Sequence, residues 1–536
     1  MKRKPFLLFL VATFVMTSCG ENNHVPESFT WEDKPWSIIE GKDFIALQDG
    51  WLRLGDIGNY SIKLEHKFTD LDDGLYYLTI DSKNEGNQDY CYIYARNSEN
   101  EEVKTSIPRY LNNESKTVTV RGIEVKNHTL NIGIASKGSS TNALLKDVQL
   151  KREENQNKKY HSLLGGSISW LDWEEDMGAK YYDEDGNEKD ALIIMKEHGC
   201  NFVRLELYNN PGAYKDQDGN YFPSEYKNAD SIFKLAQRAN ALNMEIQLSF
   251  MYSDYWGNDV IPADWEEGLK NYGTFSQKVE YLNDKVYEWT YSFMNRLKSS
   301  NIYPKYVSIG NEIDPGILIP YGDFYASEES KKAFCSFLNS GYKAVKDVSP
   351  SSQVVHHLGC NANDMHWSNH NGSGKYFFQT MKDNNVNYDV IGTSFYPYWA
   401  QTDSEYAIKK KLDLNDFKQW CEMMIDDFDK DILIMETGIN WGKPGQLANN
   451  GAYENIFPYT PEGQRDYVLD MINTVKSVKD GRCVGSLYWD PILVRQEGIG
   501  WALYGNGQAR DNCVETTTFF DYNHRVLPVL NAYKYN

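Results

Sequence analysis

Eight short apolar runs alternate with amphipathic helical patterns over residues 160–536. Nearly continuous apolar runs are typical of parallel strands that are buried on both faces. The helical spacing of Leu282, Val286, Trp289 and Phe293 is typical of a helix that packs on a sheet. Eight strand–helix units predict an α/β fold, a closed (β/α)8 TIM barrel with large loops. An open doubly wound sheet is the alternative, but no Gly-rich phosphate fingerprint follows the first strand.

The predicted barrel strands are Leu164–Trp170, Asn201–Leu207, Glu245–Tyr252, Tyr306–Ile313, Gln353–Leu358, Tyr388–Tyr396, Asp431–Thr437 and Val484–Trp489.

The preceding region, residues 29–154, has a different pattern. Short runs with period-two alternation, such as Thr117–Val120, are separated by clusters of Asn, Gly, Ser and Asp. This pattern predicts an all-β, jelly-roll-like β-sandwich. Such a domain is either a spacer or a sugar-binding module. The charged segment Lys151–Lys159 marks its boundary with the barrel domain, residues 160–536.

The N-terminus has the features of a targeting segment. Three basic residues, Lys2 to Lys4, precede the apolar run Phe6–Val15, which is too short to span a bilayer. The sequence that ends in Ser18-Cys19-Gly20 resembles a bacterial lipoprotein signal, with residues 1–18 removed, Cys19 lipidated and residues 19–28 as a tether. The alternative is an ordinary secretory signal. We expect a cell-envelope protein that the lipid anchors at the outer membrane.

Composition narrows the range of partners. The formal net charge of −21 makes nucleic acid an unfavourable partner, and the 38 Tyr and 14 Trp suit stacking on sugar rings. We expect a monomer that contacts the membrane only through its lipid. Apart from Cys19, the seven remaining Cys are scattered, which predicts mostly buried free thiols and neither a disulfide framework nor a zinc site.

Two of the predicted strands end in a glutamate. The run YVSIGNEI places Glu312 after one strand, and DILIMETG places Glu436 at the end of another. A desolvated carboxylate is costly unless it is paired or used in chemistry. Because the carboxyl ends of barrel strands meet at one face, we expect the two glutamates to face each other there and to cleave a glycosidic bond.

Other polar and aromatic side chains fall at or near the same predicted strand ends: Arg204, Asp254, Trp256, Asn311, His357, Tyr396, Trp399, Trp441 and Trp489. We interpret this set as substrate-binding. Structural ion pairing for Arg204, and loop packing for the tryptophans, are the alternatives.

Four segments carry a specific resemblance: SIGNEIDPGI, DVIGTSFYPYW, LIMETGINW and the long block from Asp176 to Pro211. From Tyr160 onward the chain resembles glycoside hydrolase family 53, the endo-β-1,4-galactanases. The Asn-Glu motif alone would indicate only the wider superfamily of retaining barrel glycosidases.

The resemblance implies that Glu312 is the general acid/base and Glu436 the nucleophile. It also implies that Asn311 binds the sugar 2-hydroxyl, that Arg204 and Tyr396 support the nucleophile, and that Trp489 forms the floor of the −1 subsite. The tryptophans at 256, 399 and 441 would stack on more distant sugar units.

The chain departs from the family pattern at two positions, where Met251 replaces a usual His and Ile319 a usual aromatic. Some family members hold a calcium in the loop after the seventh strand. Its ligands cannot be aligned onto Gly442–Tyr459, so we assign no metal and expect no required cofactor.

The sequence therefore predicts a retaining endo-β-1,4-galactanase that hydrolyses the galactan side chains of pectin. Two alternatives stay open. One is another endo-glycanase of the same superfamily, such as a mannanase or xylanase. The other is a non-catalytic glycan-binding lipoprotein, which would not need both glutamates.

Overall fold

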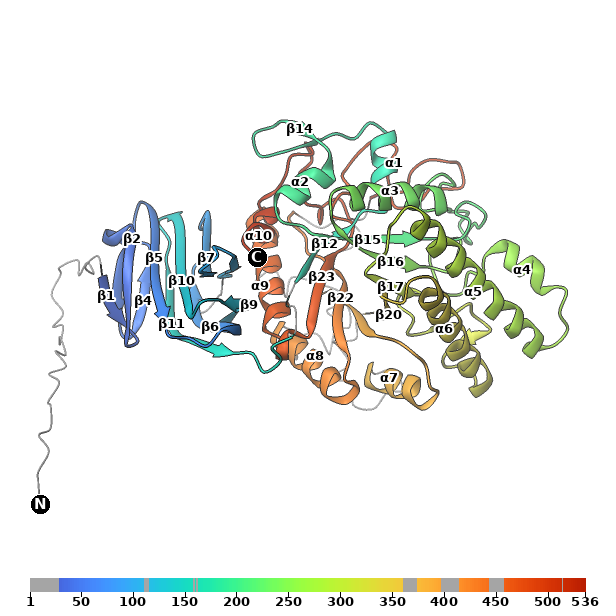
Figure 1. Ribbon diagram of the computed structural model, residues 1–536. Coiled ribbons are helices and arrows are strands. Elements are labelled where there is room, and N and C mark those ends of the chain that lie inside the picture. Colours follow the sequence, from blue (N-terminus) through green and yellow to red (C-terminus); the bar gives the residue numbers. More distant parts are fainter. Residues whose placement is uncertain are drawn as a thin grey trace, which may run out of the picture.

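The computed structural model describes residues 28–109, 115–157, 160, 162–359, 374–396, 414–442, 457–512 and 514–536. It consists of an N-terminal β-sandwich followed by a larger barrel (Figure 1). The predicted fold class, a TIM barrel with an all-β N-terminal domain, is confirmed. Within the described ranges, no helix is both long enough and apolar enough to cross a membrane.

The sandwich consists of two antiparallel sheets. One sheet has the strand order β1 (Ser28–Trp31), β2 (Lys34–Glu40), β5 (Asn59–Thr69), β10 (Thr129–Ser139), β7 (Tyr90–Asn97) and β8 (Glu102–Ser106). The other has the order β3 (Ile45–Gln48), β4 (Trp51–Leu54), β11 (Ala143–Arg152), β6 (Gly74–Asn84) and β9 (Lys116–Val125). Buried and partly exposed positions alternate along β5 and β6, so one face of each sheet forms the core.

Eight parallel strands close the barrel: β12 (Leu163–Ser167), β15 (Phe202–Leu207), β16 (Glu245–Phe250), β17 (Tyr306–Ile309), β20 (Gln353–Leu358), β21 (Val390–Phe395), β22 (Asp431–Thr437) and β23 (Cys483–Tyr488). All eight correspond to predicted strands. The predicted strands extended two to four residues too far at β12, β16 and β17, because the chain turns into loops after Ser167, Phe250 and Ile309.

Helices follow the strands around the outside: α1 (Leu171–Asp176), α2 (Ala191–Glu197), α3 (Ala229–Ala241), α4 (Ala263–Leu269), α5 (Phe275–Ser299), α6 (Glu328–Val348), α7 (Gly374–Asp383), α8 (Leu414–Phe428), α9 (Pro461–Ser477) and α10 (Asn531–Lys534). Short two-stranded pairs form in two loops, β13 (Tyr181–Tyr182) with β14 (Glu188–Lys189) and β18 (Gly316–Ile317) with β19 (Gly322–Asp323).

Side chains fill the barrel interior in layers. Near the N-terminal ends of the strands a cluster of apolar residues closes the barrel, and it contains Phe202, Val355 and Val390. Side chains alternate in direction along a strand, so every second residue points inward. Closer to the mouth of the barrel, the inward-pointing residues of these strands are polar. The polar residues are Arg204, two residues after Phe202; His357, two residues after Val355; and Ser394, four residues after Val390. An even spacing keeps each of them on the inward side of its strand, toward the mouth of the barrel.

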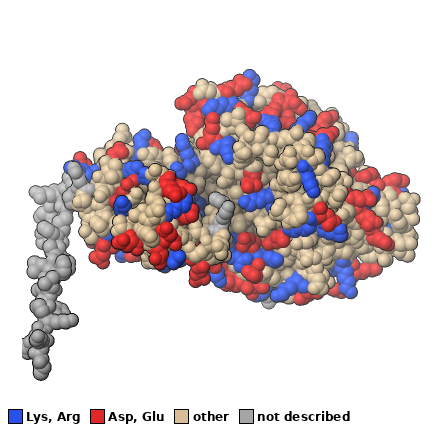
Figure 2. Space-filling view, in the orientation of Figure 1, with Lys and Arg blue, Asp and Glu red and all other residues tan. Residues whose placement is uncertain are grey.

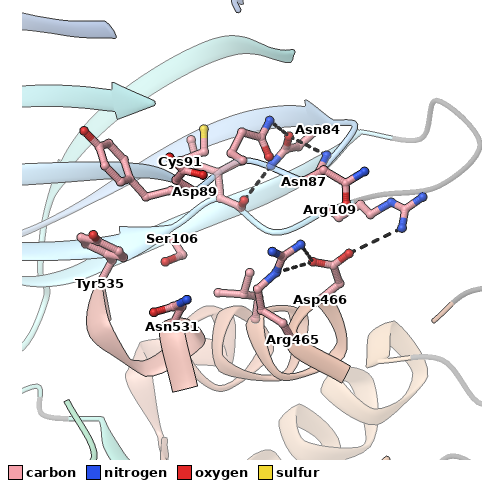
Figure 3. A pocket seen from close by; sticks show the side chains of 15 residues that line it. Asn84, Asn87, Asp89, Cys91, Ser106, Arg109, Arg465, Asp466, Asn531 and Tyr535 are labelled. Atoms are coloured by element: carbon pink, nitrogen blue, oxygen red, sulfur yellow. Dashed lines mark hydrogen bonds and ion pairs between the residues drawn. The ribbon is translucent and has the colours of Figure 1, made fainter. Parts of the chain in front are cut away.

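The sandwich lies beside α9 and α10 (Figure 1). Lys116 Nζ of β9 contacts Asp470 Oδ2 of α9 at 2.7 Å, and the rings of Tyr92 and Tyr535 stack at 4.8 Å. Figure 3 shows Asp466 between Arg465, its neighbour on α9, and Arg109 of the sandwich. These contacts lie away from the C-terminal ends of the barrel strands, and no described residue of the sandwich lines the site described below.

The visible face in Figure 2 has Lys and Arg interspersed with Asp and Glu over both domains. No large basic patch is visible there. That the protein does not bind nucleic acid stays a prediction. The described cysteines are buried and unpaired: Cys91, Cys200, Cys335, Cys421 and Cys483.

Candidate active site

A pocket of about 650 Å³ opens at the C-terminal ends of the barrel strands. It is lined by Met251, Ser253, Tyr255, Trp256, Gly257, Asn258, Asn311, Glu312, Asp314, Pro315, Glu436, Trp489 and Trp501. The predicted residues Trp256, Asn311, Glu312, Glu436 and Trp489 are therefore brought together in one cavity.

Glu312 stands on a strained turn that follows β17. Gly310 has φ +84°, and a Cβ there would lie 2.4 Å from Ile313 Cγ2, so only glycine fits this turn. Glu312 itself has φ +44°, an unfavourable conformation for a residue with a side chain. Asn258 Nδ2 donates to the backbone carbonyl of Glu312 at 3.0 Å, and the Ile313 N–H donates to the carbonyl of His357 at 2.8 Å. These hydrogen bonds hold the strained backbone at the edge of the pocket.

Glu436 reaches the pocket because β22 is irregular. Leu433 and Met435 belong to the inner cluster of the barrel, so simple alternation would direct Glu436 outward toward the helices. The register with β21 shifts, so that Thr393 pairs with Ile434 but Ser394 pairs with Glu436. One extra residue on β22 therefore re-aims the glutamate into the barrel mouth.

The two carboxyl groups are close. Glu312, His357 and Glu436 each place one side-chain atom within 4.8 Å of the others. Glu312 is partly accessible from the pocket, whereas Glu436 is 6% exposed. Burial raises the pKa of Glu312 to about 8, and the charge of Glu436 adds to the shift.

Glu436 has partners that favour its charged form. Arg204 Nη1 donates to Glu436 Oε1 at 2.6 Å, and the Tyr396 hydroxyl donates to Oε2 at 2.9 Å. Burial raises the pKa of Glu436 above its ordinary value, and Arg204 and the Tyr396 hydroxyl oppose that shift. The pocket thus holds one carboxyl that keeps its proton near neutral pH and one that is stabilised as a carboxylate.

Arg204 is the centre of a buried charge network. Its side chain is fully buried, and it also contacts Glu206 Oε1 at 2.9 Å and Asn311 Oδ1 at 2.6 Å. Glu206 in turn accepts from Lys227 Nζ at 2.6 Å. Although burial acts to raise the pKa of Glu206, Lys227 and Arg204 lower it. Because Arg204 occupies the amide oxygen of Asn311, the amide nitrogen remains as the donor toward the pocket.

Three of the predicted site residues lie differently from our expectation. Asp254 is fully buried, and its two oxygens accept from the backbone N–H groups of Asn210 and Ala263, so it fixes loops and does not face the pocket. His357 is also fully buried and contacts Ser394. Trp441 does not line the pocket, and its ring packs against Tyr522 at 5.0 Å.

Other predicted positions lie outside the described residues. These are Trp399, the lipidation site Cys19, and residues 443–456 of the loop in which a calcium was considered.

Sequence reasoning missed several residues of the site, among them Ser394 and Trp501. Ser394 donates to Glu312 Oε1 at 2.6 Å, and its place two residues before Tyr396 on an inward face is a signal that could have found it. Trp501 packs at 5.7 Å from Trp256 and lines the pocket. It comes from an irregular loop after the last barrel strand, and no periodic pattern indicates its position.

The mouth of this barrel holds two carboxyl groups, one that keeps its proton and one that is stabilised as a carboxylate, in a pocket lined by tryptophans. This arrangement is that of a glycoside hydrolase active site. The sequence model of glycosyl hydrolase family 53 matches residues 163–533, and the chain belongs to this family.

Known proteins agree with this assignment. The chain is 29% identical over 349 residues to an arabinogalactan endo-β-1,4-galactanase of Thermothelomyces thermophilus, covering 63% of this chain and 92% of the relative. It is 23% identical to an endo-β-1,4-galactanase of Bacillus subtilis, covering 73% and 89%. The family 53 catalytic domain of Ignisphaera aggregans superimposes with a TM-score of 0.58 at 27% identity, covering 71% of this chain and 98% of that one.

Proposed function

We propose that this glycoside hydrolase is an endo-acting β-1,4-galactanase that hydrolyses galactan side chains of pectin with retention of configuration. The observation that carries the mechanism is the approach of Glu312 and Glu436 to within 4.8 Å between side-chain oxygens. Retaining glycosidases place their carboxyl groups about 5–5.5 Å apart, whereas inverting enzymes need about 6.5–9.5 Å to admit a water. The names of the relatives from Thermothelomyces thermophilus and Bacillus subtilis support β-1,4-galactan as the substrate.

In the first step, Glu436 attacks the anomeric carbon while Glu312 gives its proton to the departing glycosidic oxygen. The bond that forms joins the sugar to Glu436, and the aglycone leaves as an alcohol. Arg204 and Tyr396 keep Glu436 ionised before the attack. Glu312 holds its proton because burial and the charge of Glu436 raise its pKa.

In the second step, water releases the sugar. Once Glu436 is esterified, its negative charge is gone, and the pKa of Glu312 falls. Glu312 then accepts a proton from the water that attacks the anomeric carbon. The Asn311 amide nitrogen is oriented by Arg204 to donate to a sugar hydroxyl. Trp256, Trp489 and Trp501 provide flat faces for sugar rings along the pocket.

The test is a time course of the products from linear β-1,4-galactan, with β-mannan and β-xylan in parallel, and proton NMR of the first anomer released. We expect a ladder of galacto-oligosaccharides with the β-anomer first. Cleavage of mannan or xylan but not galactan would overturn the substrate, and an initial α-anomer would overturn the mechanism. Binding of galactan without turnover would favour a non-catalytic glycan-binding protein.

We further propose that Cys19 carries the lipid that anchors the protein at the outer membrane. The basic start, the short apolar run and the Ser-Cys-Gly sequence support this proposal. Metabolic labelling with an alkyne fatty acid tests it. Label should be present in the wild type and absent in Cys19→Ser, and equal labelling of both would contradict it.

A further inference from the structure

The acid/base Glu312 has a buried hydrogen-bond partner that does not line the pocket. Ser394 of β21 donates its hydroxyl hydrogen to Glu312 Oε1 at 2.6 Å. Ser394 Oγ also lies 2.9 Å from Nε2 of His357 on β20. Ser394 and His357 are both fully buried, and neither lines the pocket. The three side chains form a chain of hydrogen bonds that runs from the barrel interior to the reacting carboxyl.

The number of hydrogens fixes the direction of this chain. A serine hydroxyl has one hydrogen, and Ser394 uses it toward Glu312. His357 must therefore donate from Nε2–H to the Ser394 oxygen. His357 is neutral, because burial and the nearby Arg204 lower its pKa far below the ordinary value. Its Nδ1 then carries no hydrogen, which suits a buried atom that has no partner within the described part of the chain.

The reverse direction is unfavourable. It would place the acidic hydrogen of Glu312 on Oε1, where it would point at Ser394 and away from a bound sugar. It would also place a hydrogen on His357 Nδ1, where no described acceptor lies. A buried N–H without an acceptor is costly.

We propose that Ser394 and His357 are positioning residues for the acid/base: together they hold Oε1 of Glu312, so that Oε2 carries the hydrogen that the leaving group receives. This inference rests on the proposed role of Glu312. The backbone of Glu312 is fixed by its strained turn and by Asn258, so the orientation of the carboxyl plane is what remains to be set. The Ser394 hydrogen bond sets it.

The charged groups around Glu312 determine the sign of a pH effect. Glu436 and Asp314 raise the pKa of Glu312, while Arg204 and the Ser394 hydrogen bond lower it. Removing the Ser394 hydroxyl leaves the other three groups in place. The pKa of Glu312 should then rise, and the alkaline limb of kcat/KM should move to higher pH by about one unit, the size expected for a hydrogen bond to a charged group.

The experiment compares Ser394→Ala with Ser394→Thr, which keeps a hydroxyl. Ser167→Ala is the matched control. It removes a fully buried hydroxyl from barrel strand β12 that has no partner within the described residues. For each protein, kcat/KM is measured against pH on galactan and on a dinitrophenyl β-galactobioside. Departure of dinitrophenolate needs no proton, so only galactan cleavage depends on a correctly oriented acid.

We expect Ser394→Ala to lose about tenfold in kcat/KM on galactan and less than threefold on the aryl substrate, with the alkaline limb moved upward. In Ser394→Thr and Ser167→Ala, the alkaline limb of kcat/KM should stay at the wild-type pH. Equal losses on the two substrates, or a limb that does not move, would overturn the proposal.

A second pair of variants applies if Ser394→Ala does not fold. His357→Leu removes the donor to Ser394, whereas the amide of His357→Gln can replace Nε2–H. The leucine variant should lose galactan activity selectively and the glutamine variant should recover part of it. Equal behaviour of the two would contradict the proposal. Failure of the proposed function itself is distinguishable, since the wild type would then not cleave galactan or Glu312→Gln would retain full activity.

Discussion

Replacement of Lys227 by methionine tests the buried charge network behind the nucleophile. Lys227 and Glu206 have side chains 0% and 2% exposed, and their charged atoms are 2.6 Å apart. Methionine retains most of the volume of the lysine stem but leaves Glu206 with Arg204 alone, and Arg204 also serves Glu436. Breaking a buried pair on one side costs about 3–5 kcal/mol of unfolding free energy. For a barrel of this size that corresponds to a fall in Tm of about 5 °C.

The loss should depend on pH. In the wild type the pKa of Glu206 is lowered, so the pair contributes stability above the unfolded pKa of a glutamate and loses it as pH falls. In Lys227→Met, burial dominates and raises the folded pKa of Glu206. The variant therefore loses stability as pH rises above about 4.5, and its difference from the wild type should be larger at pH 8 than at pH 5.

Calorimetry at the two pH values measures these differences. Lys270→Met is the matched control, because it breaks a pair with Glu267 whose side chains are 69% and 73% exposed. It should cost less than about 1 kcal/mol. The double variant Lys227→Met with Glu206→Gln should recover most of the loss, since both buried charges are then removed. The reasoning is refuted if Lys227→Met is no worse than the control, or if the double variant is no better than the single one.

Three further variants test the site. Glu312→Gln should be more stable than the wild type by roughly 5 kcal/mol at pH 9 and equal to it near pH 4.5. The folded pKa of Glu312 is raised to about 8, so wild-type stability is lost as pH rises from about 4.5 through that value. A Tm difference independent of pH would contradict this. Tyr396→Phe should move the acidic limb of kcat/KM to higher pH by about one unit, since the hydroxyl favours ionised Glu436, and an unmoved limb would argue against that role. Trp501→Ala should raise KM for galactan about tenfold with little change in kcat, as expected for uniform binding, whereas an unchanged KM would exclude sugar stacking there.

Most of the fold follows from local pattern. All eight barrel strands were predicted because a strand buried on both faces shows as an apolar run, whatever packs on it. The strand ends were less predictable. Tyr252 and Glu312 both have positive φ beyond the last ladder hydrogen bonds, and apolarity carries no information about where pairing stops.

The alternation of side chains along a strand explains which residues of the site could be predicted from the sequence. Arg204 and His357 lie two residues beyond inward apolar positions, so their direction follows from the strand. Glu436 breaks that rule, and only its irregular register brings it to the pocket. Asp254 and Trp501 lie on loops, where backbone hydrogen bonds and long-range packing determine direction. The spacing of residues in the sequence does not predict such contacts.

The most direct test of the two-glutamate mechanism is to trap its covalent intermediate. A 2-deoxy-2-fluoro-β-galactobioside with a dinitrophenyl leaving group should inactivate the enzyme and add the mass of one fluorinated disaccharide. Peptide mapping should place that mass on Glu436, and Glu436→Gln should remain unlabelled. Label on another residue, or turnover without any covalent adduct and with an initial α-product, would contradict the assignment of Glu312 and Glu436.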